Sequence, residues 1–209
     1  MITISKIRHG NDCVTLELDN GELLKIPLAV TGLYGLETGR SIDATEYAQL
    51  SVESQRYRCK AMALNYLAIC PRSALEMERY LGKKKFDRDI IREIVNAITR
   101  AGYIDDADYA ARYIENKLRK KLVGKQLLAR ELQKKGISRQ IINHALKETE
   151  TIHTDPEALY AIAQKKYAAV KDKKNSIAKL SYFLHSRGFD TEMVRTVTER
   201  ILKENEDRE

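Results

Sequence analysis

The sequence predicts a mainly α-helical fold, in which three tandem three-helix repeats form an elongated body behind a small N-terminal antiparallel β-meander. Three observations lead to this prediction. The 209 residues include 10 glycines and 3 prolines, while 32% are charged, a composition that favours helices over β-sandwiches and disorder. Short alternating stretches are concentrated in the first thirty residues. From Ser51 onward the apolar residues follow helical spacing, and one local pattern recurs.

The first thirty residues predict two or three short strands. Apolar residues nearly alternate over 2–7, alternate with period two over 13–18, and return over 23–26. Turn residues separate these stretches at His9–Asp12 and, more strongly, at Asp19–Gly21. Because so few strands are only marginally stable alone, we expect them to pack against a helix.

An internal repeat organises the rest of the chain. Segments 81–91, 132–142 and 184–194 align with a spacing of about 50 residues, the size of one helical repeat unit. In each segment a helix ends, an apolar residue follows, and an Asp or Ser then caps the next helix. The apolar residues are Phe86, Ile137 and Phe189, and the caps are Asp87, Ser138 and Asp190. The turn contains Gly136 and Gly188 in the later copies but Lys85 in the first.

A further helix is expected before each repeated segment, over about 53–68, 106–119 and 155–170. Residues 29–50 contain three glycines and predict one short helix, a turn and another short helix around Thr45–Leu50. The predicted organisation is a β-rich segment with short helices over 1–50, followed by repeats over 51–105, 106–152 and 153–209.

The junction between the first two repeats contains adjacent carboxylates. We expect Gly102 to end one helix, Tyr103 and Ile104 to fill the core, and Asp105 or Asp106 to cap the next helix. Paired carboxylates also suit acid–base or metal chemistry, but no third ligand, histidine or glycine-rich loop accompanies these two. The sequence therefore favours a helix start here.

Several functional classes lack their signatures. Cys13, Cys59 and Cys70 are scattered, and the four histidines have no zinc-ligand spacing, so we expect neither a metal nor a cofactor. The chain contains no phosphate-binding loop and no GxGxxG, GxSxG or HExxH motif, which predicts a protein that is not an enzyme and has no small-molecule substrate. No apolar run approaches the roughly 18 residues of a membrane span, and no secretory signal is recognisable. A cytoplasmic protein is expected.

The net charge of +7 is concentrated in the middle of the chain. Residues 107–150 hold eleven Lys and Arg against five Asp and Glu, a local excess of six positive charges. A basic centre indicates an acidic protein surface or a polyanion as partner, although a solvated helix face would have the same composition.

The order of motifs around this basic centre resembles the RecX family. The residues that carry the resemblance are Gly102–Ala110, the glycine-containing basic linker Lys120–Lys125, and the helix Leu127–Ile137. The similarity is strongest over about 64–146, and the third repeat departs from it through a lysine-rich approach, Lys165–Lys174. Lys85 is a further departure, since it stands where the other copies have glycine.

The resemblance implies a function that composition alone does not. Members of this family bind RecA recombinase filaments on single-stranded DNA and modulate, mostly inhibit, their ATP hydrolysis and strand exchange. That role belongs to DNA recombination, DNA repair and the SOS response. Some members also touch DNA directly, so single- or double-stranded DNA is a second implied partner. We expect a monomer.

Helical geometry selects the contact residues of the second repeat. Ala110, Ile114 and Leu118 share the inner face of helix 106–119, and Leu128 and Leu132 share that of helix 125–135. The predicted contact surface lies outside these faces and comprises Arg112, Arg119, Lys120, Lys121, Lys125, Arg130 and Lys134. Arg119 and Arg130 are the sharper candidates, because a guanidinium pairs bidentately with carboxylate or phosphate. A secondary basic patch comprises Lys83, Lys84, Lys85 and Arg88.

The alternative function is a DNA-binding helical-repeat protein with helix-turn-helix-like units. Its recognition helix would be 138–147, which carries a modest set of base-reading side chains: Arg139, Gln140, Asn143, His144 and Lys147. Tyr109 and Tyr113 suit stacking on bases, but their i, i+4 spacing beside the inner face favours packing. A generic helical scaffold is a third reading.

Overall fold

The computed structural model describes residues 1–149, 155–170 and 175–206, which divide into two compact units, Met1–Ile104 and Asp105–Glu209. The fold is mainly α-helical with a small N-terminal antiparallel sheet, as predicted. The described residues form two hydrophobic cores in each unit. The four-part division at 50, 105 and 152 stays a prediction, and its last boundary falls outside the described residues.

The first unit begins with a sheet of strand order β3-β2-β1-β4. Its strands are β1 (Ile2–His9), β2 (Cys13–Leu18), β3 (Leu23–Pro27) and β4 (Ser41–Ile42), and a short helix, α1 (Leu28–Thr31), follows β3. Gly21, with φ of +82°, occupies the predicted turn between β2 and β3. The fourth strand was not predicted because a two-residue strand is too short to show a sequence period.

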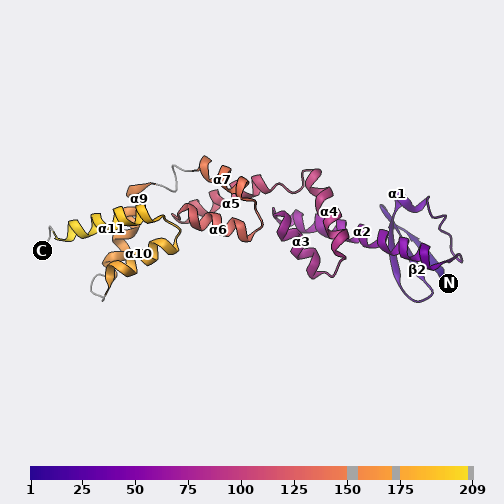
Figure 1. Ribbon diagram of the computed structural model, residues 1–209. Coiled ribbons are helices and arrows are strands. Elements are labelled where there is room, and N and C mark those ends of the chain that lie inside the picture. The colour runs from indigo at the N-terminus through magenta and orange to yellow at the C-terminus, as the bar shows by residue number, and fades with distance from the viewer. Residues whose placement is uncertain (150–154, 171–174, 207–209) are drawn as a thin grey trace. The chain divides into compact units, whose positions relative to one another are not determined.

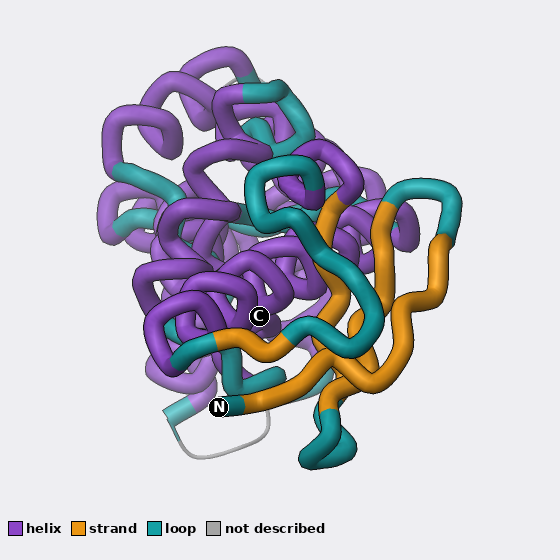
Figure 2. The backbone as a smooth tube through the Cα atoms, turned by 90° about the vertical axis from the view of Figure 1, so that its right-hand side faces the viewer, coloured by secondary structure: helices purple, strands orange, loops and turns teal. Residues whose placement is uncertain are grey.

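One continuous helix, α2 (Ala44–Ile69), replaces the two helices predicted around 45–50 and over 53–68. Neither glycine nor proline interrupts the residues between them, so the backbone has no reason to break there. The sheet packs against the first part of α2, where Leu50 joins the core of the sheet. Figures 1 and 2 show the strands at this end of the unit.

The second part of α2 packs with α3 (Ala74–Lys83) and α4 (Arg88–Arg100) around the other core of the unit. The turn between α3 and α4 closes at Lys85, whose φ of +63° is the left-handed conformation that glycine adopts in the other copies. Asp87 caps α4 through a 2.8 Å hydrogen bond from the amide of Asp89, as predicted.

The second unit contains six described helices: α5 (Asp106–Lys120), α6 (Lys125–Lys134), α7 (Arg139–Glu148), α9 (Pro156–Ala168), α10 (Ser176–Ser186) and α11 (Thr191–Glu206). The predicted turn recurs at Gly136 and Gly188, with φ of +84° and +86°. Ile137 and Phe189 are buried, and Ser138 and Asp190 accept backbone hydrogen bonds, which confirms their predicted roles. Residues 171–174 of the lysine-rich stretch lie outside the described residues.

The junction residues behave as predicted with one exception. Gly102, at φ of +78°, ends α4, and the Asp105 carboxylate caps α5 by accepting from the amides of Ala107 and Asp108. Ile104 is 3% exposed, but Tyr103 is 63% exposed, so its predicted place in the core is wrong. Successive side chains of an extended segment point in opposite directions, so only one of the two reaches the core.

Candidate interaction surface

The predicted contact surface lies on α5, on α6 and on the loop that joins them, within one compact unit. Its inner faces are formed as predicted, since Ala110, Ile114, Leu128 and Leu132 are fully buried in one core. All of the predicted basic residues are exposed: Arg112, Arg119, Lys120, Lys121, Lys125, Arg130 and Lys134. The helices therefore present these cations to solvent, while their role in binding stays a prediction.

The two arginines of α5 pair with carboxylates on their own helix. Arg112 Nε lies 2.7 Å from Asp108 Oδ2, and an Arg119 guanidinium nitrogen lies 2.8 Å from Glu115 Oε1. The hydrogen bond with Asp108 raises the pKa of Arg112. Exposed i, i+4 pairs of this kind contribute little to stability, because water screens both charges. A partner carboxylate or phosphate can therefore displace them at little cost.

Arg130 on α6 differs from these two arginines. Among the residues that the structure describes, no hydrogen bond or ion pair engages its side chain, and it is exposed. A partner that approaches Arg130 has no intramolecular ion pair to displace. This makes Arg130 the sharpest single candidate on the surface.

A polar network between α5 and α6 was not predicted. Glu131 accepts hydrogen bonds from the Tyr113 hydroxyl and from Lys117 Nζ, both at 2.8 Å. Partial burial alone would raise the pKa of Glu131, but these two hydrogen bonds outweigh it, and the pKa lies below its ordinary value. Burial, together with the carboxylate as acceptor, raises the pKa of Tyr113, so its hydroxyl remains a donor. In the sequence, only the position of Glu131 beside buried Leu132 hinted at this network.

The tyrosines of α5 pack within the repeat. Tyr109 and Tyr113 stack with ring centroids 6.4 Å apart, and Lys135 Nζ lies 5.5 and 5.3 Å from the two centroids. Both rings pack against the core of this repeat. This geometry agrees with the packing role favoured by their spacing, since a cation already covers the rings.

The secondary basic patch belongs to the other unit and has a partly structural role. Lys83, Lys84, Lys85 and Arg88 are all exposed. Lys84 Nζ lies 5.7 Å from the centroid of the Tyr80 ring, which stacks on Tyr66. The equivalent residues of the other copies, Lys135 and Arg187, also lie over aromatic rings. A cation that ends the second helix of each repeat and covers a ring is thus a common structural element.

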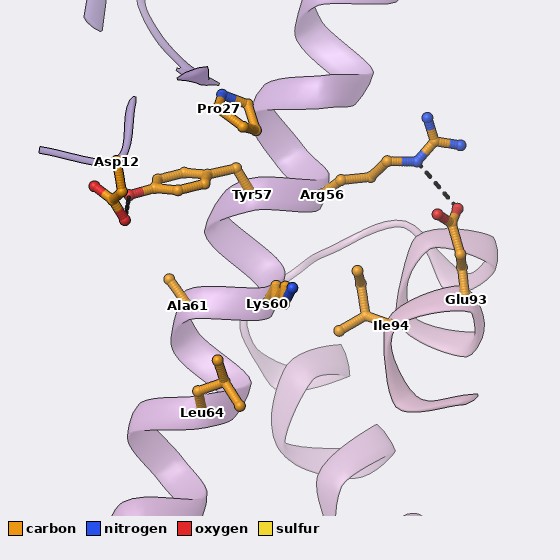
Figure 3. A pocket seen from close by; sticks show the side chains of 9 residues that line it. All are labelled: Asp12, Pro27, Arg56, Tyr57, Lys60, Ala61, Leu64, Glu93 and Ile94. Carbon is orange, nitrogen blue, oxygen red and sulfur yellow. Dashed lines mark hydrogen bonds and ion pairs between the residues drawn. The ribbon is translucent and has the colours of Figure 1, made fainter. Parts of the chain in front are cut away.

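The first unit also contains a cavity of about 390 Å³ between α2, α4, the β1–β2 turn and the end of β3 (Figure 3). Its charged and polar groups are largely paired with one another. Arg56 bonds Glu93 at 3.0 Å and Glu53 at 2.7 Å, and the Tyr57 hydroxyl donates to Asp12 at 2.8 Å. These bonds join α2 to α4 and to the β1–β2 turn. The polar groups of the cavity therefore hold neighbouring elements together, and the cavity is not a candidate ligand site.

The described residues contain no cluster of three or more His, Cys, Asp or Glu side chains arranged to hold a metal ion. None of their helices combines the length and the apolar character that crossing a bilayer requires.

Two family models match separate segments of this chain. Residues 105–146 match the family model described as RecX, second three-helix domain, and residues 59–96 match that of RecX, first three-helix domain. Regulatory protein RecX of Bacillus cytotoxicus is 28% identical over 180 residues, which cover 86% of this chain and 67% of that protein. Regulatory protein RecX of Clostridioides difficile is 25% identical over 205 residues, covering 97% of this chain and 96% of the relative.

Solved structures agree with these matches. A crystal structure of regulatory protein RecX superposes on this chain with a TM-score of 0.74 at 21% sequence identity. The superposition covers 95% of this chain and 100% of the other, and it shows a similarity of fold. A crystal structure of RecX from Lactobacillus salivarius gives a TM-score of 0.61 at 25% identity and covers 70% of this chain and 96% of the other.

Proposed function

The chain belongs to the RecX family, and from this membership we propose that it binds the RecA filament on single-stranded DNA and inhibits its ATPase and strand-exchange activities. The relatives are named regulatory proteins, which supports a role without chemistry of its own. A monomer acting in the cytoplasm, without a cofactor, completes the proposal.

The observation that carries the proposal is the exposed basic surface of α5 and α6 on the part of the chain that matches the family's second three-helix domain. Two exposed acidic residues of α5, Asp108 and Glu115, are held in weak intrahelical pairs. A negatively charged partner therefore meets cations that are already oriented by two well-packed helices.

Direct DNA binding is the second candidate, and one observation favours it. The outer side of α7 exposes Arg139, Gln140, Asn143, His144 and Lys147 together. A helix that reads base edges needs such a row of donors and acceptors.

One titration separates the two functions. RecA is assembled on single-stranded DNA, the protein is added from well below one per RecA up to equality, and ATP hydrolysis is measured. We expect inhibition of ATP hydrolysis at ratios well below one protein per RecA. The absence of any effect at one protein per RecA would contradict the leading proposal. Binding to naked DNA that weakens steeply with salt, without any effect on RecA, would instead establish the second candidate.

A further inference from the structure

The second and third repeats meet through their backbones. The Gly124 amide donates to the Arg187 carbonyl at 2.9 Å, and the Gln126 amide donates to the Gly188 carbonyl at 3.1 Å. Amides in the first turn of a helix have no partner within that helix, and Gly124 offers α6 no capping side chain. The end of α10 therefore supplies the cap that α6 lacks, and the negative end of one helix dipole faces the positive end of the other.

Glycine is required on both sides of this contact. A Cβ at Gly124 would stand 2.1 Å from the Gly188 carbonyl oxygen, and a Cβ at Gly188 would stand 2.2 Å from the Leu127 amide nitrogen. Both obstacles are backbone atoms, which no side-chain rotation can move away. Gly188 also has a φ of +86°, whereas Gly124 has a φ of −78° and so needs glycine only for space.

The loop before α6 contributes to the hydrophobic packing of both repeats. Leu122 packs against the core formed by α9, α10 and α11, while its neighbour Val123 is buried in the core of α5, α6 and α7. Side chains of consecutive residues point in opposite directions along an extended loop, so one loop can join two cores. The junction thus combines two backbone hydrogen bonds with apolar packing on both sides.

The two segments that meet here are also free of carboxylate side chains. Residues 116–130 contain six Lys and Arg, residues 175–189 contain two, and neither segment contains Asp or Glu. Lys121 and Lys125 flank the docked glycine and are exposed, and the Arg187 guanidinium lies 4.5 Å from the centroid of the Phe183 ring. Cations from two repeats therefore gather around one fixed backbone contact.

We propose that this junction is an interaction surface that the second and third repeats form together, with Gly124 and Gly188 as positioning residues and an acidic protein surface as partner. The inference rests on the proposed function and locates the partner on the protein part of the RecA filament. The contact between Gly124 and Gly188 fixes the angle between the two repeats, so their cations have a fixed spacing that can match acidic side chains on a rigid protein assembly. Such preorganisation lowers the entropic cost of binding. A flexible single strand of DNA would adapt to any angle and would not require the contact between the two glycines.

The first arm of the test measures the junction without RecA. Amide hydrogen exchange is compared for the wild type, Gly124→Ala and Gly188→Ala. Slow exchange at Gly124 and Gln126 in the wild type, lost in both variants, is the expected result. Gly32→Ala, at φ of −64°, and Gly102→Ala, at φ of +78°, are the matched controls, because both have open space where the Cβ would stand. Fast exchange at both amides in the wild type would contradict a fixed backbone contact between the two repeats.

The second arm measures affinity for RecA filaments. We expect about tenfold weaker binding for Gly124→Ala, since lost preorganisation of about 1.4 kcal/mol corresponds to that factor. If Gly124→Ala fails to fold, Lys121→Gln with Lys125→Gln replaces it, with the exposed pair Lys6→Gln and Lys60→Gln as control. Unchanged affinity in the folded variant contradicts the proposal. Equal affinity of the wild type for naked single-stranded DNA contradicts the acidic-protein partner. A wild type without effect on RecA instead contradicts the proposed function, whatever the exchange data give.

Discussion

The hydroxyl of Ser54 on α2 accepts a hydrogen bond at 2.9 Å from the backbone amide of Lys25 on β3. Ser54 is 1% exposed, and the bond lies at a part-buried contact between the sheet and the helix. It gives a partner to a backbone amide of β3, which is an edge strand of the sheet. The N-terminal sheet is thus fixed to the helix that it shares with the first repeat.

Ser54→Ala tests that attachment. Removal of the acceptor leaves the Lys25 amide without its partner at a part-buried contact, which should lower the free energy of unfolding by about 1 kcal/mol. Denaturant unfolding of the full chain measures this change in the free energy of unfolding. Ser51→Ala on the same helix, with no described side-chain hydrogen bond, should change the value by less than about 0.5 kcal/mol. Equal effects of the two substitutions would mean that the bond adds nothing to stability.

Lys85→Gly should stabilise the first unit. Lys85 holds a φ of +63°, which costs a residue with a Cβ about 1 kcal/mol and costs glycine nothing. Part of the gain is offset by the greater freedom of glycine in the unfolded chain. Thermal unfolding measures the change, with Lys83→Gly as the matched control at the last residue of α3, where glycine should destabilise. A loss of stability in Lys85→Gly would show that the left-handed turn is not strained.

The stability of the second unit should depend on pH through the protonation of Glu131. Its pKa is lower in the folded chain than in the unfolded chain, so its stabilising contribution is complete above the ordinary carboxyl value of about 4.3 and is lost as pH falls through the folded value. Glu131→Gln should therefore remove part of the acid sensitivity of unfolding. Unfolding curves at neutral and acidic pH test this, with Glu115→Gln as an exposed carboxylate control. Identical pH profiles for the wild type and Glu131→Gln would rule out the network as a source of acid sensitivity.

Tyr113→Phe examines the same network from the donor side. The change removes one hydrogen bond to a carboxylate and leaves the ring stack with Tyr109 in place. We expect a loss of about 1–2 kcal/mol at neutral pH, because hydrogen bonds to charged groups exceed neutral ones. The loss should shrink in the Glu131→Gln background, which a double-mutant cycle measures. Fully additive effects would contradict coupling between the two residues.

The contact surface is tested by Arg119→Ala combined with Arg130→Ala. Both side chains are exposed, so folding should be unaffected, while inhibition of RecA should require roughly tenfold more protein, equivalent to about 1.4 kcal/mol. Arg130→Ala alone should account for most of the loss, since Arg119 already pairs with Glu115. Arg195→Ala, an exposed arginine that pairs with Glu199 on α11, is the matched control. Wild-type inhibition by a folded double variant would show that the surface is misplaced.

The sequence by itself determined the local architecture of this protein. Helix period, capping residues and the glycine turns are set by neighbouring residues, so the strands before Pro27, the caps at Asp87, Ser138 and Asp190, and the burial of Ile137 and Phe189 were all predictable. The outward position of the basic residues on α5 and α6 followed from the same periodicity.

Only the tertiary structure decided which distant groups meet. The docking of Gly124 on Gly188, the bond between Ser54 and Lys25, and the convergence of Tyr113 and Lys117 on Glu131 all join residues far apart in the chain. Spacing along one helix cannot reveal such pairs, because they depend on how whole elements pack. The continuity of α2 belongs to the same class, since packing on both a sheet and a helical core supports its length.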